Sequence, residues 1–184
     1  KLGDKFRKVA AEAAKIGREL TFGTRLQIIV RETEEEAWAH AEKLLQRTSL
    51  HTARTAIERQ LPPGVSFEDF HSDDPQTQRN VESIRAGRLP KARDLEIYPN
   101  VWLGPSLFGF NILGPAAGTY LMGSAEQVAE RIREYEAQGT SAFILSGFPL
   151  IDEAHRVADW LFPLLDLYHG FAGPRLNAVQ PQEA

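Results

Sequence analysis

The sequence predicts an α/β protein built around a parallel β-sheet. Short apolar runs rich in β-branched residues alternate with amphipathic helical patterns, and this alternation occurs three times along the 184-residue chain. Strands that alternate with helices are typical of parallel sheets, because two parallel strands need a long crossover connection. A less regular stretch separates the first strand–helix unit from the other two, so we expect a long insertion there.

The first predicted elements are a helix and a strand–helix unit. Apolar residues recur at helical spacing over residues 4–19. The run Thr24–Val30 is rich in β-branched residues and predicts the first strand. Thr33 and Glu36 have the spacing of a capping box, in which both side chains accept backbone N–H groups at the start of a helix. We expect that helix to continue to about Gln46.

The stretch 48–118 is irregular by comparison and holds most of the chain's Pro residues. Its polar part, residues 51–92, contains only short helical patterns. It follows a strand–helix unit, which is where active-site lids occur. We therefore expect this part to form a mobile cover over an active site.

The last two units restore the regular pattern. Thr119–Met122 and Ser141–Ser146 predict strands. Ser124, with a Gln three residues later, predicts the start of the helix between them, and Gly139 predicts its end. Asp152 is predicted to cap the final helix.

Three strand–helix units are too few for a complete parallel fold. A (β/α)8 barrel takes about 250 residues, and an open three-stranded sheet would leave exposed edges. We therefore expect residues 1–168 to be one part of a larger fold, within a longer protein. In this division, about 48–118 would be the insertion and active-site loop region, and 169–184 a loose C-terminal tail.

The composition excludes several classes of function. The formal net charge is -4, and the 21 basic residues are dispersed among 25 acidic ones, so a nucleic-acid partner is not expected. Cys is absent, which excludes disulfides and thiolate chemistry and fits a cytoplasmic protein. The apolar runs are far shorter than the roughly 20 residues of a membrane-spanning helix. The five His residues lack metal-ligand spacing, so no metal site is expected.

Four segments carry a resemblance to a known family. They are FGTRLQIIVRETEEEAW at 22–38, RDLEIYPNVWLG at 93–104, AGTYLMG at 117–123 and SGFPLIDEAHRV at 146–157. In this order they resemble the C-terminal half of alkanesulfonate monooxygenases, which belong to the bacterial-luciferase-like superfamily of flavin-dependent monooxygenases.

The resemblance implies a fold and an activity. The fold would be the C-terminal half of a luciferase-like (β/α)8 TIM barrel, with the three predicted strands as its sixth, seventh and eighth. The activity would be that of a two-component monooxygenase, an oxidoreductase that uses reduced FMN (FMNH2) and inserts oxygen from O2 into a small organosulfur or related substrate. A separate NAD(P)H-dependent flavin reductase would supply the flavin, and we expect a homo-oligomer.

The first predicted strand carries the main candidate site residues. Arg25 and Gln27 lie two apart, so their side chains point to the same side of the strand. On the resemblance, Arg25 matches an active-site Arg, and its planar fork of donors suits an oxyanion. The alternative is that Arg25 forms a structural salt bridge. Gln27 stands where the family has His, so this position cannot titrate near neutral pH.

Two further positions depart from the family. Phe148, which follows Gly147 at the end of the last predicted strand, stands where the family has Tyr. The apolar segment Ser106–Gly118 has no basic residue, although the family places an Arg in this loop. Together with Gln27, these departures predict a pocket that favours an uncharged substrate over a sulfonate. Trp102 lies near the expected active face and is a further pocket candidate, although a Trp at such a position is more often a core residue.

Three alternatives remain open at this point. Basic residues of the insertion could supply the missing cations, the candidates being Arg88, Lys91 and Arg93. The cofactor could be the deazaflavin F420, which related enzymes of the same fold use. The chain could also belong to a non-catalytic luciferase-like subunit.

Overall fold

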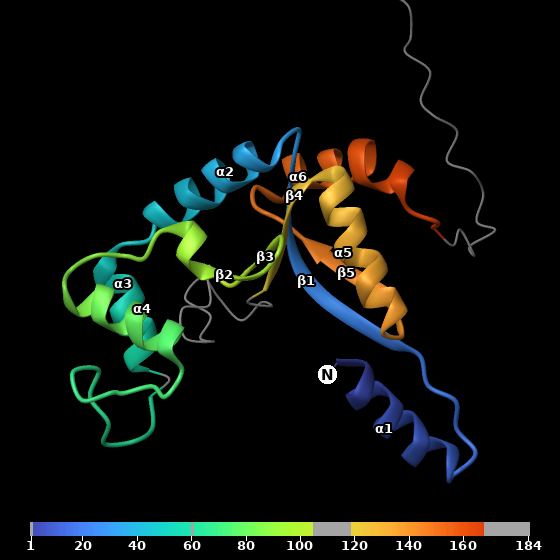
Figure 1. Cartoon of the computed structure of the whole chain (residues 1–184), viewed down its shortest axis with the longest axis horizontal. Coiled ribbons are helices and arrows are strands. Elements are labelled where there is room, and N and C mark those ends of the chain that lie inside the picture. The colour runs from blue at the N-terminus through green and yellow to red at the C-terminus, as the bar shows by residue number, and fades with distance from the viewer. Residues whose placement is uncertain (1, 60, 105–118, 168–184) are drawn as a thin grey trace, which may run out of the picture.

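A five-stranded β-sheet with helices packed on both faces organises the chain (Figure 1). The computed structural model describes residues 2–59, 61–104 and 119–167. The strands are β1 (Phe22–Arg31), β2 (Glu96–Tyr98), β3 (Val101–Trp102), β4 (Tyr120–Ser124) and β5 (Thr140–Ser146). The helices are α1 (Leu2–Ala14), α2 (Glu34–Gln46), α3 (Leu50–Glu58), α4 (Pro75–Arg85), α5 (Ala125–Ala137) and α6 (Leu150–Arg156), with the short turns η1 (Ala92–Leu95), η3 (Val157–Leu161) and η4 (Phe162–Leu164).

The three predicted strands are confirmed and correspond to β1, β4 and β5. β1 pairs in parallel with both of the others, so it lies between them. Its residues 26–30 are all buried, which is the pattern of a strand covered on both faces. The β-branched side chains of Ile28, Ile29 and Val30 suit this position, because they pack well on a pleated surface.

Alternate residues of β1 contribute to two separate hydrophobic cores. Leu26, Ile28 and Val30 pack with α5 and with the turns that follow α6. Ile29 lies on the opposite face and packs with α2, together with Tyr120 of β4. The sheet is therefore the middle layer of three, with helices on each side.

The strand order differs from that of consecutive barrel strands. In a (β/α)8 barrel each strand pairs with its successor and the helices form one outer layer, so the expected order is β1–β4–β5. The observed order is β2–β3–β4–β1–β5, with α2 on one face and α5 on the other. Three parallel strands cannot close on themselves, so an open sheet needs helical cover on both faces. The strand order of the described residues therefore does not confirm the predicted barrel segment.

The hairpin of β2 and β3 was not predicted. It pairs antiparallel to the free edge of β4 and extends the sheet by two short strands. Asn100 in its turn has φ 63, a left-handed conformation that Asn tolerates better than most residues. Strands of three and two residues are too short for a recognisable alternation of polar and apolar side chains.

The predicted helix ends are mostly confirmed. The Thr33 hydroxyl accepts the N–H of Glu36 at 3.2 Å and caps α2. Ser124 and Gln127 form a reciprocal capping box at the start of α5. Gly139 follows that helix with φ 103, as a helix-terminating Gly requires.

Two predicted helix boundaries are wrong. α6 begins at Leu150 after Pro149, so Asp152 lies within the first turn and does not cap the helix. The N-terminal helix, predicted over 4–19, ends at Ala14, because Gly17 turns the chain with φ 70. Among the described residues, no helix is long and apolar enough to cross a membrane.

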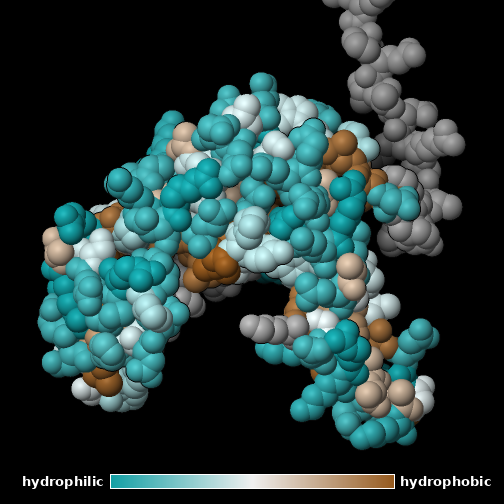
Figure 2. Space-filling model, in the orientation of Figure 1, coloured by the Kyte–Doolittle hydropathy of each residue, from teal (hydrophilic) through white to brown (hydrophobic). Residues whose placement is uncertain are grey.

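The region predicted to be irregular contains two regular helices. α3 and α4 form a lobe beyond the C-terminal end of α2, and the molecule arches between this lobe and α1 (Figures 1 and 2). The lobe has a buried interior continuous with that of α2; its members are Ala53, Ile57, Phe67, Val81 and Ile84. Two guanidinium groups, those of Arg54 and Arg85, lie 5.3 and 5.5 Å from the ring centroid of Phe67. The domain division and the mobile-cover role of this region stay predictions.

Candidate functional site

A buried carboxylate joins the carboxyl end of β1 to α6. Glu153 is 1% exposed, and its Oε1 accepts the backbone N–H of Val30 at 2.6 Å. Its Oε2 pairs with the guanidinium of Arg31 at 2.8 Å. β5 pairs with β1 only as far as Gln27, so the Val30 N–H on that edge needs another acceptor. Glu153 supplies it with one carboxylate oxygen and pairs with Arg31 through the other.

Gly147, predicted as a pocket residue, allows this arrangement. A Cβ added at Gly147 would lie 2.3 Å from Cγ of Glu153 and 3.0 Å from the carbonyl oxygen of Ile28. These distances are below normal contact, so any side chain here would displace α6 from the sheet. The Gly that follows β5 is therefore required by packing.

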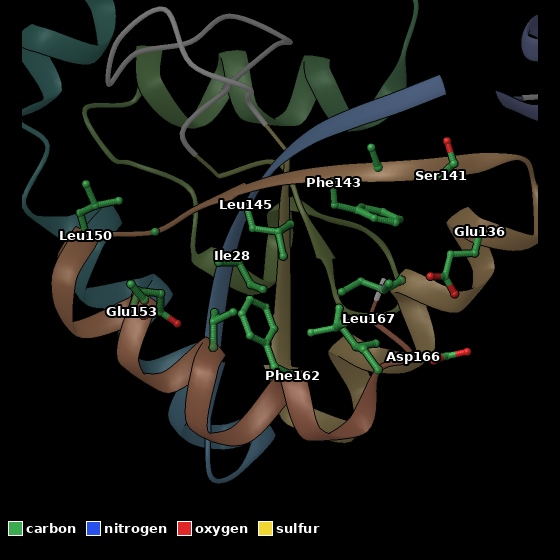
Figure 3. Close-up of a pocket in the computed structure, with 16 residues that line it drawn as sticks. Ile28, Glu136, Ser141, Phe143, Leu145, Leu150, Glu153, Phe162, Asp166 and Leu167 are labelled. Atoms are coloured by element: carbon green, nitrogen blue, oxygen red, sulfur yellow. The ribbon is translucent and has the colours of Figure 1, made fainter. Parts of the chain in front are cut away.

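A largely apolar cavity of about 620 Å³ lies beside this ion pair, and we call it the α5–α6 cavity. Figure 3 shows Ile28, Leu145 and Phe162 pointing toward its interior. Glu136 and Asp166 lie at one end of the cavity and Glu153 at the other (Figure 3). No Lys, Arg or His is among its described lining residues.

Phe148 lies in the turn after Gly147 and is 45% exposed. Its carbonyl oxygen accepts a hydrogen bond from Nε2 of His40 on α2 at 3.0 Å. Burial lowers the pKa of His40, and the hydrogen bond to Phe148 partly opposes that effect. Gly147 and Phe148, adjacent in sequence, thus contact different helices: Gly147 contacts α6 and Phe148 contacts α2.

Gln27 is a buried polar residue in the middle of the sheet. It is 3% exposed, and its Oε1 has no hydrogen-bond partner among the described residues. Its Cα pairs with Tyr120 on one side and Ser146 on the other. Burial raises the pKa of Tyr120 to about 12, so this phenol stays neutral. A buried acceptor without a donor lowers the free energy of unfolding. The Oε1 of Gln27 can therefore accept a hydrogen bond from the N–H or O–H group of a ligand.

Arg25 lies two residues before Gln27 on β1 and is exposed. It makes no ion pair with the rest of the described chain. The alternative prediction of a structural salt bridge for Arg25 therefore finds no support. Its guanidinium is available to an anion that reaches this part of the sheet.

Trp102 is a core residue in this structure. Its side chain is fully buried, and its Nε1–H donates to the carbonyl oxygen of Ala92 at 3.0 Å. Its ring meets that of Tyr120 edge to face, with centroids 5.2 Å apart. No part of the indole is left for a ligand, so the predicted pocket role of Trp102 does not fit. The segment Ser106–Gly118, which was predicted to line the pocket, lies outside the described residues.

One of the basic residues considered as a substitute cation already has partners. Arg93 pairs with Glu34 at 2.9 Å and with Glu96 at 3.2 Å. Its guanidinium also lies 4.1 Å from the ring centroid of Trp38. These contacts hold the insertion against α2, so Arg93 is not free to enter a pocket.

Sequence reasoning missed Glu153, Arg31 and His40. One signal for Glu153 was present, because it has helical spacing with the apolar Val157 and Leu161 and so lies on the buried side of the last helix. Arg31 and His40 gave no such signal, since their partners are more than 100 residues away in sequence. In the described ranges, no group of three or more His, Cys, Asp or Glu could hold a metal ion.

The chain is similar to known proteins in both sequence and fold. Residues 1–142 match the family model described as luciferase-like monooxygenase. One similar solved structure is that of riboflavin lyase, crystallised with a modified FMN and the substrate riboflavin. It superposes with a TM-score of 0.56 at 20% sequence identity, over 89% of this chain and 35% of the lyase chain. This chain therefore spans about a third of the length of that enzyme, and the likeness is one of fold.

Proposed function

The chain belongs to the luciferase-like monooxygenase family, and on that premise we propose that it is part of a flavin-dependent oxidoreductase. In finer terms, we propose a two-component monooxygenase similar to alkanesulfonate monooxygenases. It would take reduced FMN from a separate NAD(P)H-dependent reductase and oxidise a small organic substrate with O2. The observation that carries the proposal is the family match, which includes Arg25 and Gln27 within residues 1–142.

Two side chains of β1 fit a flavin. The unpartnered Oε1 of Gln27 is an acceptor for an N–H group such as the edge of a flavin ring presents. Arg25, exposed and without an ion pair, offers donors to an anionic oxygen. When bound in its reduced form, flavin supplies the electrons that activate O2. The protein's own part is to orient the ring, bind the substrate and exclude water.

The fold of the longer protein is part of the same proposal. We propose that β1, β4 and β5 become consecutive strands of a (β/α)8 barrel when the rest of the polypeptide is present. β5 then moves from β1 to the edge of β4 that β3 occupies here, and a preceding strand takes the place of β5 beside β1. We further propose a cytoplasmic homo-oligomer without nucleic-acid or membrane partners.

The substrate we propose is uncharged. Burying a fixed negative charge needs several matched donors or cations. Among the predicted pocket positions, Gln27 and Phe148 are neutral, and Arg25 is the one cation. A sulfone, sulfide or aldehyde therefore fits better than a linear alkanesulfonate.

Flavin titration of the full-length protein tests the cofactor. We expect saturable FMN binding that is tighter for the reduced form under anaerobic conditions, and O2 consumption when a flavin reductase and substrate are added. Binding of F420 in preference to FMN would support the F420-dependent alternative. Absence of binding to either cofactor would support a non-catalytic subunit and contradict the proposal.

The role of Arg25 is tested by Arg25→Ala and Arg25→Lys. Removing one preorganised donor typically costs about 2.7–4 kcal/mol of transition-state stabilisation, or roughly a hundredfold to a thousandfold in turnover. Lys should restore little, because it lacks the planar fork. Arg18→Ala removes a similarly exposed guanidinium near α1 and is the matched control. Unchanged turnover in Arg25→Ala would show that Arg25 has no part in the reaction.

A further inference from the structure

A second cavity, of about 630 Å³, lies between α2, the start of α3 and the turn after β5. We call it the α2–α3 cavity. Its lining residues are His40, Lys43, Leu44, Arg47, Thr48, Ser49, Thr52, Phe148 and Pro149. Two of these are permanent cations and none is an acid, although the chain as a whole carries a net charge of -4. Its charge is therefore opposite in sign to that of the protein.

The cations of this cavity have no partners within the protein. Neither Lys43 nor Arg47 makes an ion pair with any other described residue, and both are exposed. Elsewhere in the chain, Arg54, Arg93 and the buried Arg131 each pair with two carboxylates. The charge of Lys43 and Arg47 is thus not required to balance an acid of this chain.

The hydroxyl of Thr48 adds a polar group to the same cavity. Thr48 is 8% exposed, and its side chain makes no hydrogen bond to another residue in the part of the chain that the structure describes. Thr48 lies between Arg47, the C-cap of α2, and Ser49, the N-cap of α3. The Ser49 hydroxyl accepts the N–H of Thr52 at 3.0 Å. The start of α3 also brings the positive end of a helix dipole to this cavity. Hydroxyls, cations and a helix start suit an anion with several oxygen atoms.

Part of the cavity lining is apolar. Phe148 and Pro149 form it, and the His40 side chain anchors the Phe148 carbonyl to α2. Leu44 adds a further apolar side chain to the lining. A ligand that fills the cavity therefore needs a flat or apolar part beside its anionic group.

We propose that the α2–α3 cavity binds a small phosphomonoester that carries an aromatic or other apolar ring. The side chains of Lys43 and Arg47 bind the phosphate, and the Thr48 hydroxyl donates a hydrogen bond to it. Phe148 packs against the ring. A carboxylate would use fewer of these donors, because it has two oxygen atoms and one charge, whereas a phosphomonoester has three terminal oxygens and nearly two charges.

Calorimetric titration of the flavin-free, full-length protein with phenyl phosphate tests this site. We expect saturable binding that weakens by at least about tenfold in the double variant Lys43→Gln/Arg47→Gln, since each cation makes charge-assisted hydrogen bonds. The matched control is Lys8→Gln/Arg18→Gln, which removes one Lys and one Arg that are also exposed, at the other end of the molecule. Phe148→Ala should weaken phenyl phosphate binding and leave the weaker binding of inorganic phosphate unchanged.

Two sources of the phosphomonoester can be distinguished in the same protein. If the ligand is separate from the flavin, phenyl phosphate binds equally well with and without saturating FMN. If it is the phosphate of FMN itself, FMN displaces phenyl phosphate, and the Lys43/Arg47 double variant weakens FMN binding but not riboflavin binding. Either result supports a phosphomonoester site. Absence of saturable binding, or equal weakening in both double variants, would overturn it, and neither outcome depends on whether the protein is a monooxygenase.

Discussion

The two cavities have nearly the same volume, about 620 and 630 Å³, but their charged groups serve different purposes. In the α5–α6 cavity the buried charge is Glu153, which already accepts a strand N–H and pairs with Arg31. In the α2–α3 cavity the charges are Lys43 and Arg47, which are exposed and have no described partner. A charged residue beside a cavity therefore indicates a binding site only when its hydrogen bonds are not already used by the fold.

This difference predicts where substitutions affect stability and where they affect binding. Residues that hold the α5–α6 cavity together should lower stability when changed. Residues that line the α2–α3 cavity should change ligand binding or pH dependence and leave the fold intact. Three variants test the comparison, in decreasing order of expected effect.

Glu153→Ala should have the largest effect on stability. It leaves the Arg31 guanidinium and the Val30 N–H unpaired in a buried place, and breaking a buried pair in this way costs about 3–5 kcal/mol. Urea unfolding of the full-length protein measures the loss. Asp152→Ala, which removes an exposed carboxylate from the preceding position, is the control and should change the midpoint little. Equal midpoints for the two variants would mean that Glu153 does not hold the structure together.

Gly147→Ala should have an intermediate effect. The added methyl group would lie 2.3 Å from Cγ of Glu153, so α6 must shift, and overpacking of this kind costs about 1–3 kcal/mol. Gly23→Ala adds the same methyl group to β1, where the nearest atom is 3.5 Å away, an ordinary contact. The same urea unfolding experiment should separate the two. If Gly23→Ala is the more destabilising variant, Glu153 does not pack closely against Gly147.

His40 should give the smallest effect, visible as a pH dependence. Because burial lowers the pKa of His40 in the folded state, the unfolded state binds the proton more readily. The resulting stability is present above the unfolded pKa of about 6.5 and is lost as the pH falls toward the lower folded value. The positive charges of Arg31 and Arg156 also lower the pKa of His40, whereas Glu153 and the hydrogen bond to the Phe148 carbonyl raise it.

The measurement is the urea midpoint from neutral to mildly acidic pH. His40→Gln should show a flatter profile than the wild type, and the exposed His155→Gln should follow the wild type. Saturating phenyl phosphate should reduce the loss of stability at low pH, because an anion beside His40 favours its protonated form. Parallel profiles for all three proteins would show that His40 does not contribute.

Much of the fold was predictable because its signals are local. The runs that became β1, β4 and β5 are short, apolar and β-branched, and Thr33, Ser124 and Gly139 are helix-end residues with a direct physical role. The candidate site was less predictable. Alternation along β1 places Arg25 and Gln27 on the same side of the strand. For Trp102 the sequence left a core role and a pocket role open, and the structure shows the core role.

The amino-acid sequence by itself determined the α/β class, the positions of the three parallel strands and the membership of the luciferase-like family, because each depends on residue types at fixed local spacing. Only the tertiary structure decided the order β4–β1–β5, the Glu153–Arg31 ion pair and the meeting of α2 with the Phe148 turn. These features join residues more than 90 positions apart in the sequence. Their formation depends on which sheet edges and faces remain to be covered after the local elements have formed.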